Sequence, residues 1–139
     1  SGTCGAAKEA SLMGYKSIAI SAEKNSRVPD PPYRKAVDFL TAHLDELVSS
    51  SVADHYININ VPFAGDISDY SSATAECVRV YKREITTESL GDGRFLCHTK
   101  DNGMVERNKT DKCDVSLTER GIISVSSVQI APTCIDIDI

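Results

Sequence analysis

The sequence predicts an α/β fold, in which helices pack against a sheet. A helix-compatible segment of small residues at 4–13, followed by a glycine at 14, precedes a short apolar run at 17–21. A strongly amphipathic segment at 31–51 leads into a strand-like alternation at 57–61. Helices that lead into short apolar strands are typical of a layered α/β arrangement.

The first helix and strand are predicted from composition and punctuation. Gly14 is a natural end for the first helix, because glycine readily adopts the left-handed conformation found at helix C-termini. The run at 17–21, Ser-Ile-Ala-Ile-Ser, is short enough for a buried strand. Residues 22–30 are polar and contain Pro29, so they predict a loop.

The second helix is predicted from its periodicity. Asp30 is the expected N-cap, and Pro31 and Pro32 suit the first turn. The helix should end near 49–51, and its apolar positions recur at helical spacing: Val37, Leu40, His43 or Leu44, Leu47 and Val48. Beyond it, isoleucine and asparagine alternate from 57 to 60, which predicts a strand entering Val61-Pro62.

The middle of the chain predicts a hairpin. Residues 63–76 are polar and indicate a surface segment. The runs at 77–81 and 95–99 read as strands, and turn residues occur at 91–93 and 102–103. No obvious helix covers this antiparallel pair. Since an uncovered hairpin is only marginally stable, we expect it to pack on a partner subunit.

The last third predicts a helix, a strand and a tail. Thr110-Asp111 is the expected cap of a short helix through Leu117, with Gly121 beyond its end. Residues 122–128 are strongly β-branched and predict a strand. In the tail, 131–139, isoleucine alternates with aspartate, which fits either an edge strand or an unstructured end.

Composition excludes some classes of function. The chain has 139 residues, 41% hydrophobic and 25% charged, and a formal net charge of −5. That charge does not favour a nucleic-acid partner, and no apolar run approaches the roughly 20 residues that span a bilayer. No signal peptide is seen. There is no CxxC pair either, so a zinc site is not expected. We predict a cytoplasmic protein with reduced, mostly buried thiols at Cys4, Cys77, Cys97, Cys113 and Cys134.

Ser1, Gly2 and Thr3 form the candidate phosphate site. They directly precede the first helix, whose opening N–H groups and dipole suit an anion, and two hydroxyls lie beside them. Taken alone, this pattern is more often a helix cap without a ligand.

Four segments in order resemble the SurE family. Residues 1–7, SGTCGAA, are similar to the YSGTVGAA that closes the family pattern GxNxGxxxxYSGTVGAA. Gly14 with 17–21 resembles the stretch G-(I/V)-P-(S/A)-(I/L)-A-(I/V)-S, and 57–62, ININVP, resembles LNVNVP. Thr110-Asp111 with 117–125 resembles TDxxALxxGYVSITPL. Together the four segments extend over most of the chain.

The resemblance implies a metal-dependent phosphomonoesterase acting on nucleoside 5′- and 3′-monophosphates. It implies the C-terminal part of a Rossmann-type three-layer fold with a β-hairpin extension, assembled as a homodimer or tetramer. The divalent cation, Mg²⁺ or Mn²⁺, would be held by an Asp-Asp pair, a Ser and an Asn, all upstream of Ser1 and outside this chain. By family position this chain supplies part of the phosphate site, Ser1, Gly2 and Thr3, and needs the upstream half as a partner.

Some residues depart from the family pattern. Ser126-Ser127-Val128 stands where the family reads T-P-L, which puts the geometry after the last strand in doubt. Cys4 replaces the common valine, and 63–105 match only in outline.

Other candidate residues have weaker support. His43 is expected at the helix boundary or surface, and His55 and His98 have no obvious acid or cysteine partner in sequence. A Cys–His nucleophile pair has no local signature. Asp136 and Asp138 could bind a cation, but a solvated edge explains them better.

Three segments and three hypotheses follow. Residues 1–62 are assigned to the Rossmann-like core, 63–109 to the hairpin and oligomerisation extension, and 110–139 to the closing helix, strand and tail. The leading hypothesis is a nucleotidase in which this chain alone is inactive. The alternatives are a non-catalytic assembly module and a nucleotide-binding protein without catalysis.

Overall fold

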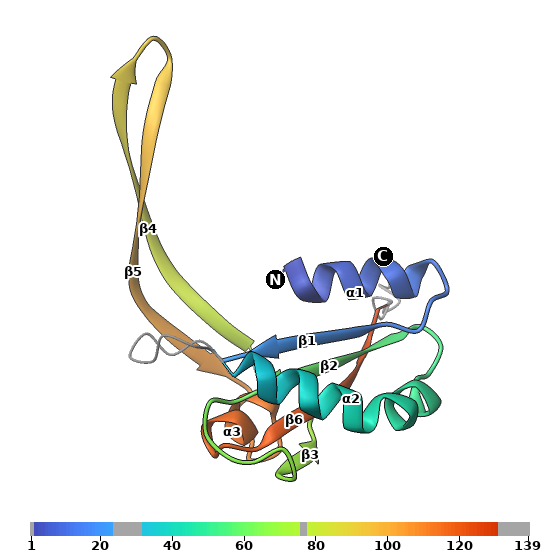
Figure 1. Ribbon diagram of the computed structural model, residues 1–139. Coiled ribbons are helices and arrows are strands. Elements are labelled where there is room, and N and C mark those ends of the chain that lie inside the picture. Colours follow the sequence, from blue (N-terminus) through green and yellow to red (C-terminus); the bar gives the residue numbers. More distant parts are fainter. Residues whose placement is uncertain (1, 24–31, 76–77, 131–139) are drawn as a thin grey trace, which may run out of the picture.

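The computed structural model describes residues 2–23, 32–75 and 78–130. It confirms an α/β fold, with helices on both faces of a four-stranded sheet and a long two-stranded hairpin projecting from it (Figure 1). The elements in chain order are α1 (Gly2–Leu12), β1 (Ile18–Ala22), α2 (Tyr33–Ser50), β2 (His55–Val61), β3 (Tyr70–Ser72), β4 (Val78–Gly91), β5 (Arg94–Arg107), α3 (Asp114–Glu119) and β6 (Ile123–Gln129).

The sheet has the strand order β1-β2-β6-β3. β1 runs parallel to β2, β6 runs antiparallel to β2, and β3 runs parallel to β6. This register pairs Ser21 with Asn60, and Asn60 with Ser124. Because paired residues project from the same face of a sheet, three polar side chains form a row across β1, β2 and β6.

The main core lies between the sheet and α2. Phe39 of α2, Ile59 of β2 and Ile123 of β6 are each at most 1% exposed. Burial of side chains of this size stabilises the fold by about 1.5–3 kcal/mol each. The remaining buried members of this cluster are Ala36, Leu47, Ile57 and Val61.

The amphipathic stripe predicted for α2 is wider than its buried face. Leu40 and Leu47 pack into the core, as expected. Val37, Leu44 and Val48, however, are exposed to 58%, 45% and 38%. The helix therefore carries apolar side chains beside its buried face that the described part of the chain leaves exposed.

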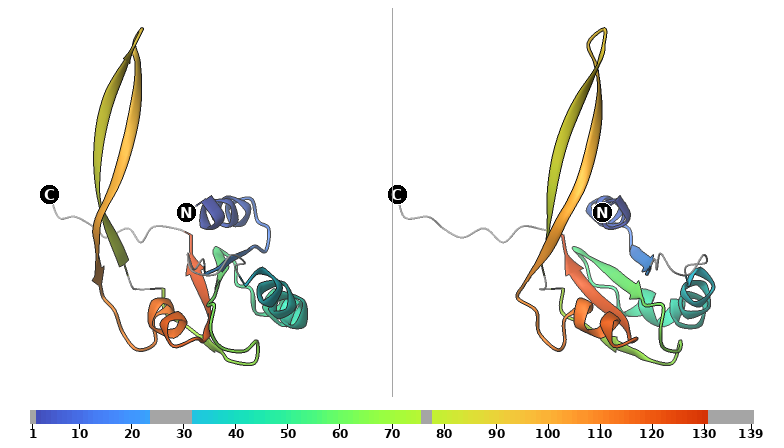
Figure 2. Two further views of the ribbon diagram at one scale, coloured as in Figure 1. Left: turned by 60° about the vertical axis from the view of Figure 1, so that its left-hand side comes forward. Right: turned by 90° about the vertical axis from the view of Figure 1, so that its left-hand side faces the viewer.

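On the other face, α1 packs over β1 and β2 (Figure 2). Ala7 and Ala19 are buried there with Tyr56. Ser11 is buried beside them and makes two polar contacts. Its hydroxyl lies 2.6 Å from that of Ser17 and donates a hydrogen bond to the His55 carbonyl at 3.1 Å. The predicted helix end is confirmed, because Gly14 follows α1 with φ of +85°.

Two predicted helix caps are wrong. Pro32 holds the N-cap position of α2 without a side-chain cap, so Asp30, which lies outside the described residues, is not the cap. The N-cap of α3 is Cys113, whose Sγ accepts from the Ser116 amide at 3.4 Å. Thr110 instead lies in the preceding turn, where its carbonyl accepts from the Cys113 amide at 3.2 Å.

The middle segment contains more strand than predicted. β3 lies within 63–76, and the two hairpin strands have 14 residues each. Gly91-Asp92-Gly93 forms the turn region, as predicted, but 102–103 lie inside β5. There the pairing register shifts and Gly103 has φ of +100°, so this pair makes a bulge rather than a turn.

The loop after β2 is held in place from two sides. Lys35 of α2 donates to the carbonyls of Phe63, Ala64 and Gly65 at 3.3, 2.6 and 3.2 Å. Gly65 also lies directly against the Gly121 carbonyl, where a Cβ would collide with backbone. A side chain at this position would force apart two loops that border the carboxyl end of β2.

We expect Gly65→Ala to lower the free energy of unfolding by roughly 3 kcal/mol, combining left-handed strain with overpacking. Gly14→Ala is the matched control, because Gly14 also has a positive φ but open space around it. That control should cost only about 1–2 kcal/mol. Urea denaturation measures both, and equal losses would contradict the close contact between Gly65 and Gly121.

Candidate functional site

A cavity of about 350 Å³ opens where β1 and β2 end. Parallel strands present their carboxyl ends at one edge of a sheet, and open α/β sheets bind ligands at such edges. Its lining residues come from these strand ends and from α3: Ser21, Ala22, Glu23, Asn60, Val61, Asp114, Val115, Thr118 and Glu119.

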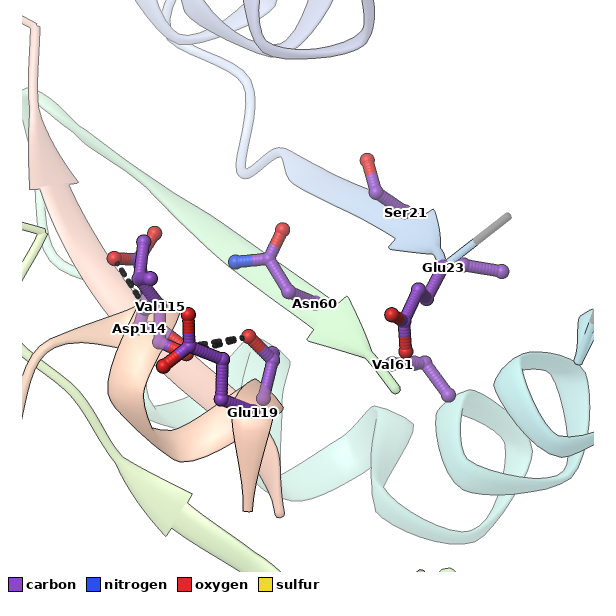
Figure 3. Close-up of a pocket in the computed structure, with 9 residues that line it drawn as sticks. Ser21, Glu23, Asn60, Val61, Asp114, Val115 and Glu119 are labelled. Atoms are coloured by element: carbon purple, nitrogen blue, oxygen red, sulfur yellow. Dashed lines mark hydrogen bonds between the residues drawn. The ribbon is translucent and has the colours of Figure 1, made fainter. Parts of the chain in front are cut away.

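Ser21 and Asn60 form the floor of this cavity on the face that α1 covers (Figure 3). They are paired across β1 and β2. Asn60 donates from Nδ2 to the Ser124 hydroxyl at 3.2 Å, which orients the amide. The floor therefore offers an amide and a hydroxyl in fixed relative positions.

α3 supplies one wall of the cavity. Asp114 accepts from the Val115 amide at 2.8 Å, and the Thr118 hydroxyl bonds to carbonyls of its own helix. Glu119 accepts from Lys109 Nζ at 2.7 Å. Hydrogen bonds to Glu106 and Glu119 raise the pKa of Lys109, so this lysine stays charged and partly offsets the acidic wall.

The third carboxylate, Glu23, belongs to the opposite wall. Its Oε2 accepts from the Phe63 amide at 2.8 Å and so ties the end of β1 to the loop after β2. Each of the three carboxylates thus already accepts a hydrogen bond. Such a cavity suits hydroxyl and amino groups of a ligand better than a bare phosphate, which the negative charges would repel.

The beginning of α1 lies near this cavity. α1 runs antiparallel to β1 and β2, so its C-terminal half lies beside His55 and its first turn near the strand ends (Figure 1). Cys4 Sγ lies 3.7 Å from Asn58 Oδ1. Asn60 is two residues farther along the same face, about 7 Å beyond Asn58. These contacts therefore indicate that the start of α1 lies close to Asn60 along the direction of β2.

Of the predicted phosphate residues, Gly2 and Thr3 form the first turn of α1 and are exposed. Ser1 lies outside the described residues. The first four N–H groups of a helix have no partner within it, and the helix dipole adds partial positive charge. The first turn thus offers donors to an anion, while the acidic cavity nearby offers acceptors.

Tyr56 and Cys4 anchor the first turn of α1 to β2. Burial raises the pKa of Tyr56, and negative charge on the Cys4 thiol together with a hydrogen bond to it raises this pKa further. The neutral phenol is therefore the form that the folded chain favours.

The described residues do not fit the divalent cation that the family resemblance implies. In the parts of the chain with assigned positions, no group of three or more His, Cys, Asp or Glu side chains could hold a metal ion. The carboxylates of the cavity accept hydrogen bonds from other groups instead. That the metal ligands lie outside this chain stays a prediction.

The other predicted candidates lie apart from the cavity. His43 is a boundary residue, as predicted, with its ring 4.7 Å from those of Phe39 and Tyr70. His55 bonds the Ala53 carbonyl at 2.9 Å. His98 does face an acid across the hairpin, because its Nε2 lies 3.6 Å from Glu88. That contact is on an exposed strand and does not form a site.

The thiols are less buried than predicted. Cys113 is buried, Cys4 is half-buried and Cys97 is exposed. Cys77, Cys134, Asp136 and Asp138 lie outside the described residues.

Sequence reasoning missed the cavity residues. Asn58 and Asn60 were taken only as the polar positions of an alternating strand, although Asn58 is 8% exposed. Two asparagines in a strand covered on both faces are a usable signal, because buried amides need partners. Asp114, Thr118 and Glu119 had no signal of their own, since only the fold of 110–123 brings them to β2.

The chain is similar to SurE proteins in sequence and in structure. A family model described as "Survival protein SurE" matches residues 1–87. A curated relative named 5′-nucleotidase SurE, from Pseudothermotoga lettingae, is 26% identical over 133 residues, which are 94% of this chain and 48% of that protein. The crystal structure of the SurE protein from Aquifex aeolicus matches with a TM-score of 0.60 at 18% identity, over 96% of this chain and 53% of that one.

The chain therefore spans about half the length of the relatives that it matches. The structural likeness shows the fold, including its Rossmann-like α/β character. Among the helices that the structure describes, none is long and apolar enough to cross a membrane.

We expect the free energy of unfolding to fall as pH rises above 10, in part because of Tyr56. The raised pKa means that the unfolded chain ionises first, so this stabilisation is present below pH 10 and is lost as pH rises through the folded-state pKa. Tyr56→Phe should lose less stability between pH 9 and 11, measured by urea denaturation. Tyr15→Phe alters an exposed tyrosine, so its free energy of unfolding should change with pH as in the unmodified chain. Identical pH profiles for Tyr56→Phe and the unmodified chain would contradict the role of Tyr56.

Proposed function

This chain belongs to the SurE family, whose model matches more than half of its 139 residues, and we propose that the protein it forms part of hydrolyses nucleoside monophosphates. The reaction proposed is cleavage of the phosphate monoester at the 5′ position, and also at the 3′ position. The relative from Pseudothermotoga lettingae bears the name of such an enzyme.

The observation that carries this proposal is the position of the helix start beside the cavity. Gly2 and Thr3 open α1 at the edge of the sheet where the cavity lies. An anion at the start of the helix would accept hydrogen bonds from the free backbone N–H groups and from the Thr3 hydroxyl. Ser1, by family position, belongs to the same phosphate site.

The cavity itself suits the nucleoside part of the substrate. A ribose presents hydroxyl groups and a base presents amino groups. The carboxylates of Glu23 and Asp114 can accept hydrogen bonds from both. Asn60 and Ser21 can donate to and accept from the same groups. The substrate would thus lie with its phosphate at α1 and its sugar toward α3, an arrangement that follows the charges of the two regions.

A divalent cation, Mg²⁺ or Mn²⁺, is proposed to be held by the half of the protein that this chain lacks. Such an ion supplies charge neutralisation and an activated water in phosphoester hydrolysis. The residues of this chain bind and orient the phosphate, and the helix start stabilises its negative charge. Because the chain has no fitting ligand group of its own among the described residues, we expect it to be inactive by itself.

The alternative that a specific observation favours is an assembly module. The hairpin β4–β5 projects from the body of the molecule (Figure 2), and Ile85 and Phe95 are exposed to 65% and 64%. Exposed apolar side chains on a projecting ribbon are typical of a surface that packs on another subunit. A homodimer or tetramer is thus proposed, and it is compatible with catalysis. Binding of a nucleotide without turnover is the third reading.

The proposed function is tested by hydrolysis of AMP with Mn²⁺. The protein that joins this chain to its missing half should be active, whereas this chain alone should not hydrolyse AMP or p-nitrophenyl phosphate. In the active protein, Thr3→Val should lower kcat/KM about ten- to hundredfold, the cost of one hydrogen bond to a charged group. Thr41→Val, on the exposed side of α2, is the matched control.

Hydrolysis by this chain alone at the rate of the complete enzyme would contradict the external metal site. AMP binding without turnover in the complete protein would favour the nucleotide-binding alternative. Equal rates for Thr3→Val and Thr41→Val would remove α1 from the phosphate site.

We expect the double substitution I85E/F95E to convert an oligomer into monomers, because it places two charges on one face of the hairpin. Light scattering after size-exclusion chromatography measures the molecular mass. Thr86→Glu, on the opposite face of β4, should leave the assembly intact. A chain that is monomeric before substitution, or an oligomer unaffected by I85E/F95E, would contradict association through this face.

A further inference from the structure

Lys109 connects the hairpin to one wall of the cavity. Its Nζ lies 2.8 Å from Glu106 Oε2, near the end of β5, and donates to Glu119 Oε2, at the end of α3, at 2.7 Å. Glu119 lines the cavity from α3 (Figure 3). One ammonium group therefore links a carboxylate of the cavity to the point where the hairpin joins the body of the molecule.

The surrounding backbone keeps this link in place. Arg120, directly after α3, donates from Nη2 to the carbonyl of Asp111, in the loop after β5, at 2.7 Å. At the other end of α3, the Asp114 amide donates to the carbonyl of Thr74, four residues before β4, at 3.1 Å. Both ends of α3 are thus bonded to the segments that flank the hairpin, so the lysine and its partner on α3 keep a fixed separation.

The backbone of α3 and the carboxylate of Glu119 are held by different contacts. Val115 and Leu117 are buried and anchor the helix in the interior. The Glu119 side chain, in contrast, is 49% exposed, so burial does not select one of its rotamers. The ion pair with Lys109 orients this carboxylate, and loss of the pair would leave the helix itself in place.

Removal of the lysine would also turn its two partners against each other. The carboxylates of Glu106 and Glu119 both contact the same nitrogen atom of Lys109, so they lie close together. Without the ammonium group, two like charges at this separation repel each other. We therefore expect the Glu119 carboxylate to leave its place at the cavity when position 109 carries no charge.

We propose that Lys109 is a positioning residue for the nucleoside part of the substrate, because it holds Glu119 where the carboxylate accepts a hydrogen bond from a sugar hydroxyl or a base amino group. A carboxylate can accept about four hydrogen bonds, so one that is held by a lysine can still accept from a ligand. The arrangement favours phosphate monoesters whose leaving group carries hydroxyl or amino groups over aryl phosphates without them. The inference rests on the proposed function, which places the sugar toward α3.

The test compares kcat/KM for AMP with kcat/KM for p-nitrophenyl phosphate, which has neither a ribose nor an amino group. It uses the complete protein, in which this chain is joined to the part of the fold that it does not cover, with Mn²⁺. In Lys109→Met, the ratio of the two values should fall about three- to tenfold, the range for one misplaced hydrogen bond. Lys109→Arg should restore most of the ratio, because it keeps the charge and several donors.

Lys112→Met is the matched control for charge. It removes one positive charge from the same loop and should leave the ratio unchanged. Glu119→Gln should lower the ratio as Lys109→Met does, and K109M/E119Q should lower it no further, because both substitutions remove the same contact.

Inhibition constants separate orientation of the nucleoside from a general change at the site. Adenosine, which has the ribose and base without the phosphate, should inhibit hydrolysis of p-nitrophenyl phosphate. Its inhibition constant should rise about three- to tenfold in Lys109→Met. The inhibition constant of inorganic phosphate should rise less than that of adenosine, because the phosphate is proposed to bind at α1.

An unchanged ratio in Lys109→Met, or equal losses in Lys109→Met and Lys112→Met, would overturn the positioning role and leave the proposed function in place. Fully additive losses for Lys109→Met and Glu119→Gln would overturn it as well. No hydrolysis of AMP by the unmodified complete protein would contradict the proposed function and overturn this inference with it.

Discussion

The parallel pairing of β1 with β2 determines where the other elements of the sheet and the cavity lie. It brings the carboxyl ends of two strands to one edge and aligns Ser21 with Asn60. α1, which must reverse at Gly14 to enter β1, consequently starts at that same edge. β6 then pairs with β2 and brings α3 to the edge as a wall. One register thus determines both the helix start that suits an anion and the cavity beside it.

The two parts of the site differ in charge, and this difference organises the proposed chemistry. The start of α1 offers N–H donors and partial positive charge. The cavity offers carboxylates that already accept hydrogen bonds from Phe63, Val115 and Lys109. A nucleoside monophosphate has the complementary pattern, with an anion at one end and hydroxyl and amino groups at the other. No side-chain group among the described residues fits the divalent cation proposed for hydrolysis, so the proposal assigns that cation to the part of the relatives' length that this chain does not match.

Local signals predicted most of the elements but not their contacts. Periodicity located α2 and β2, and Gly14 located the end of α1, because those signals are encoded within a few neighbouring residues. The N-cap at Cys113 was missed because a thiol is a weak acceptor and Thr110 is a better capping residue by type. The cavity was missed because Asn60 and Asp114 meet only through the pairing of β2 with β6. In that pairing Asn60 lies opposite Ser124, which is 64 residues later in the sequence. The helical spacing of the apolar residues in α2 did not separate the buried positions from the exposed ones, because these residues continue around the helix.

The anionic end of the substrate is proposed to bind at the start of α1. A crystal structure of the assembled protein, with this chain and the part of the fold that it does not cover, soaked with AMP would locate the phosphate. We expect phosphate oxygens about 2.7–3.2 Å from the amide nitrogens of Gly2 and Thr3, with the ribose toward Asn60. A phosphate bound elsewhere, with those amides facing solvent or protein, would contradict it.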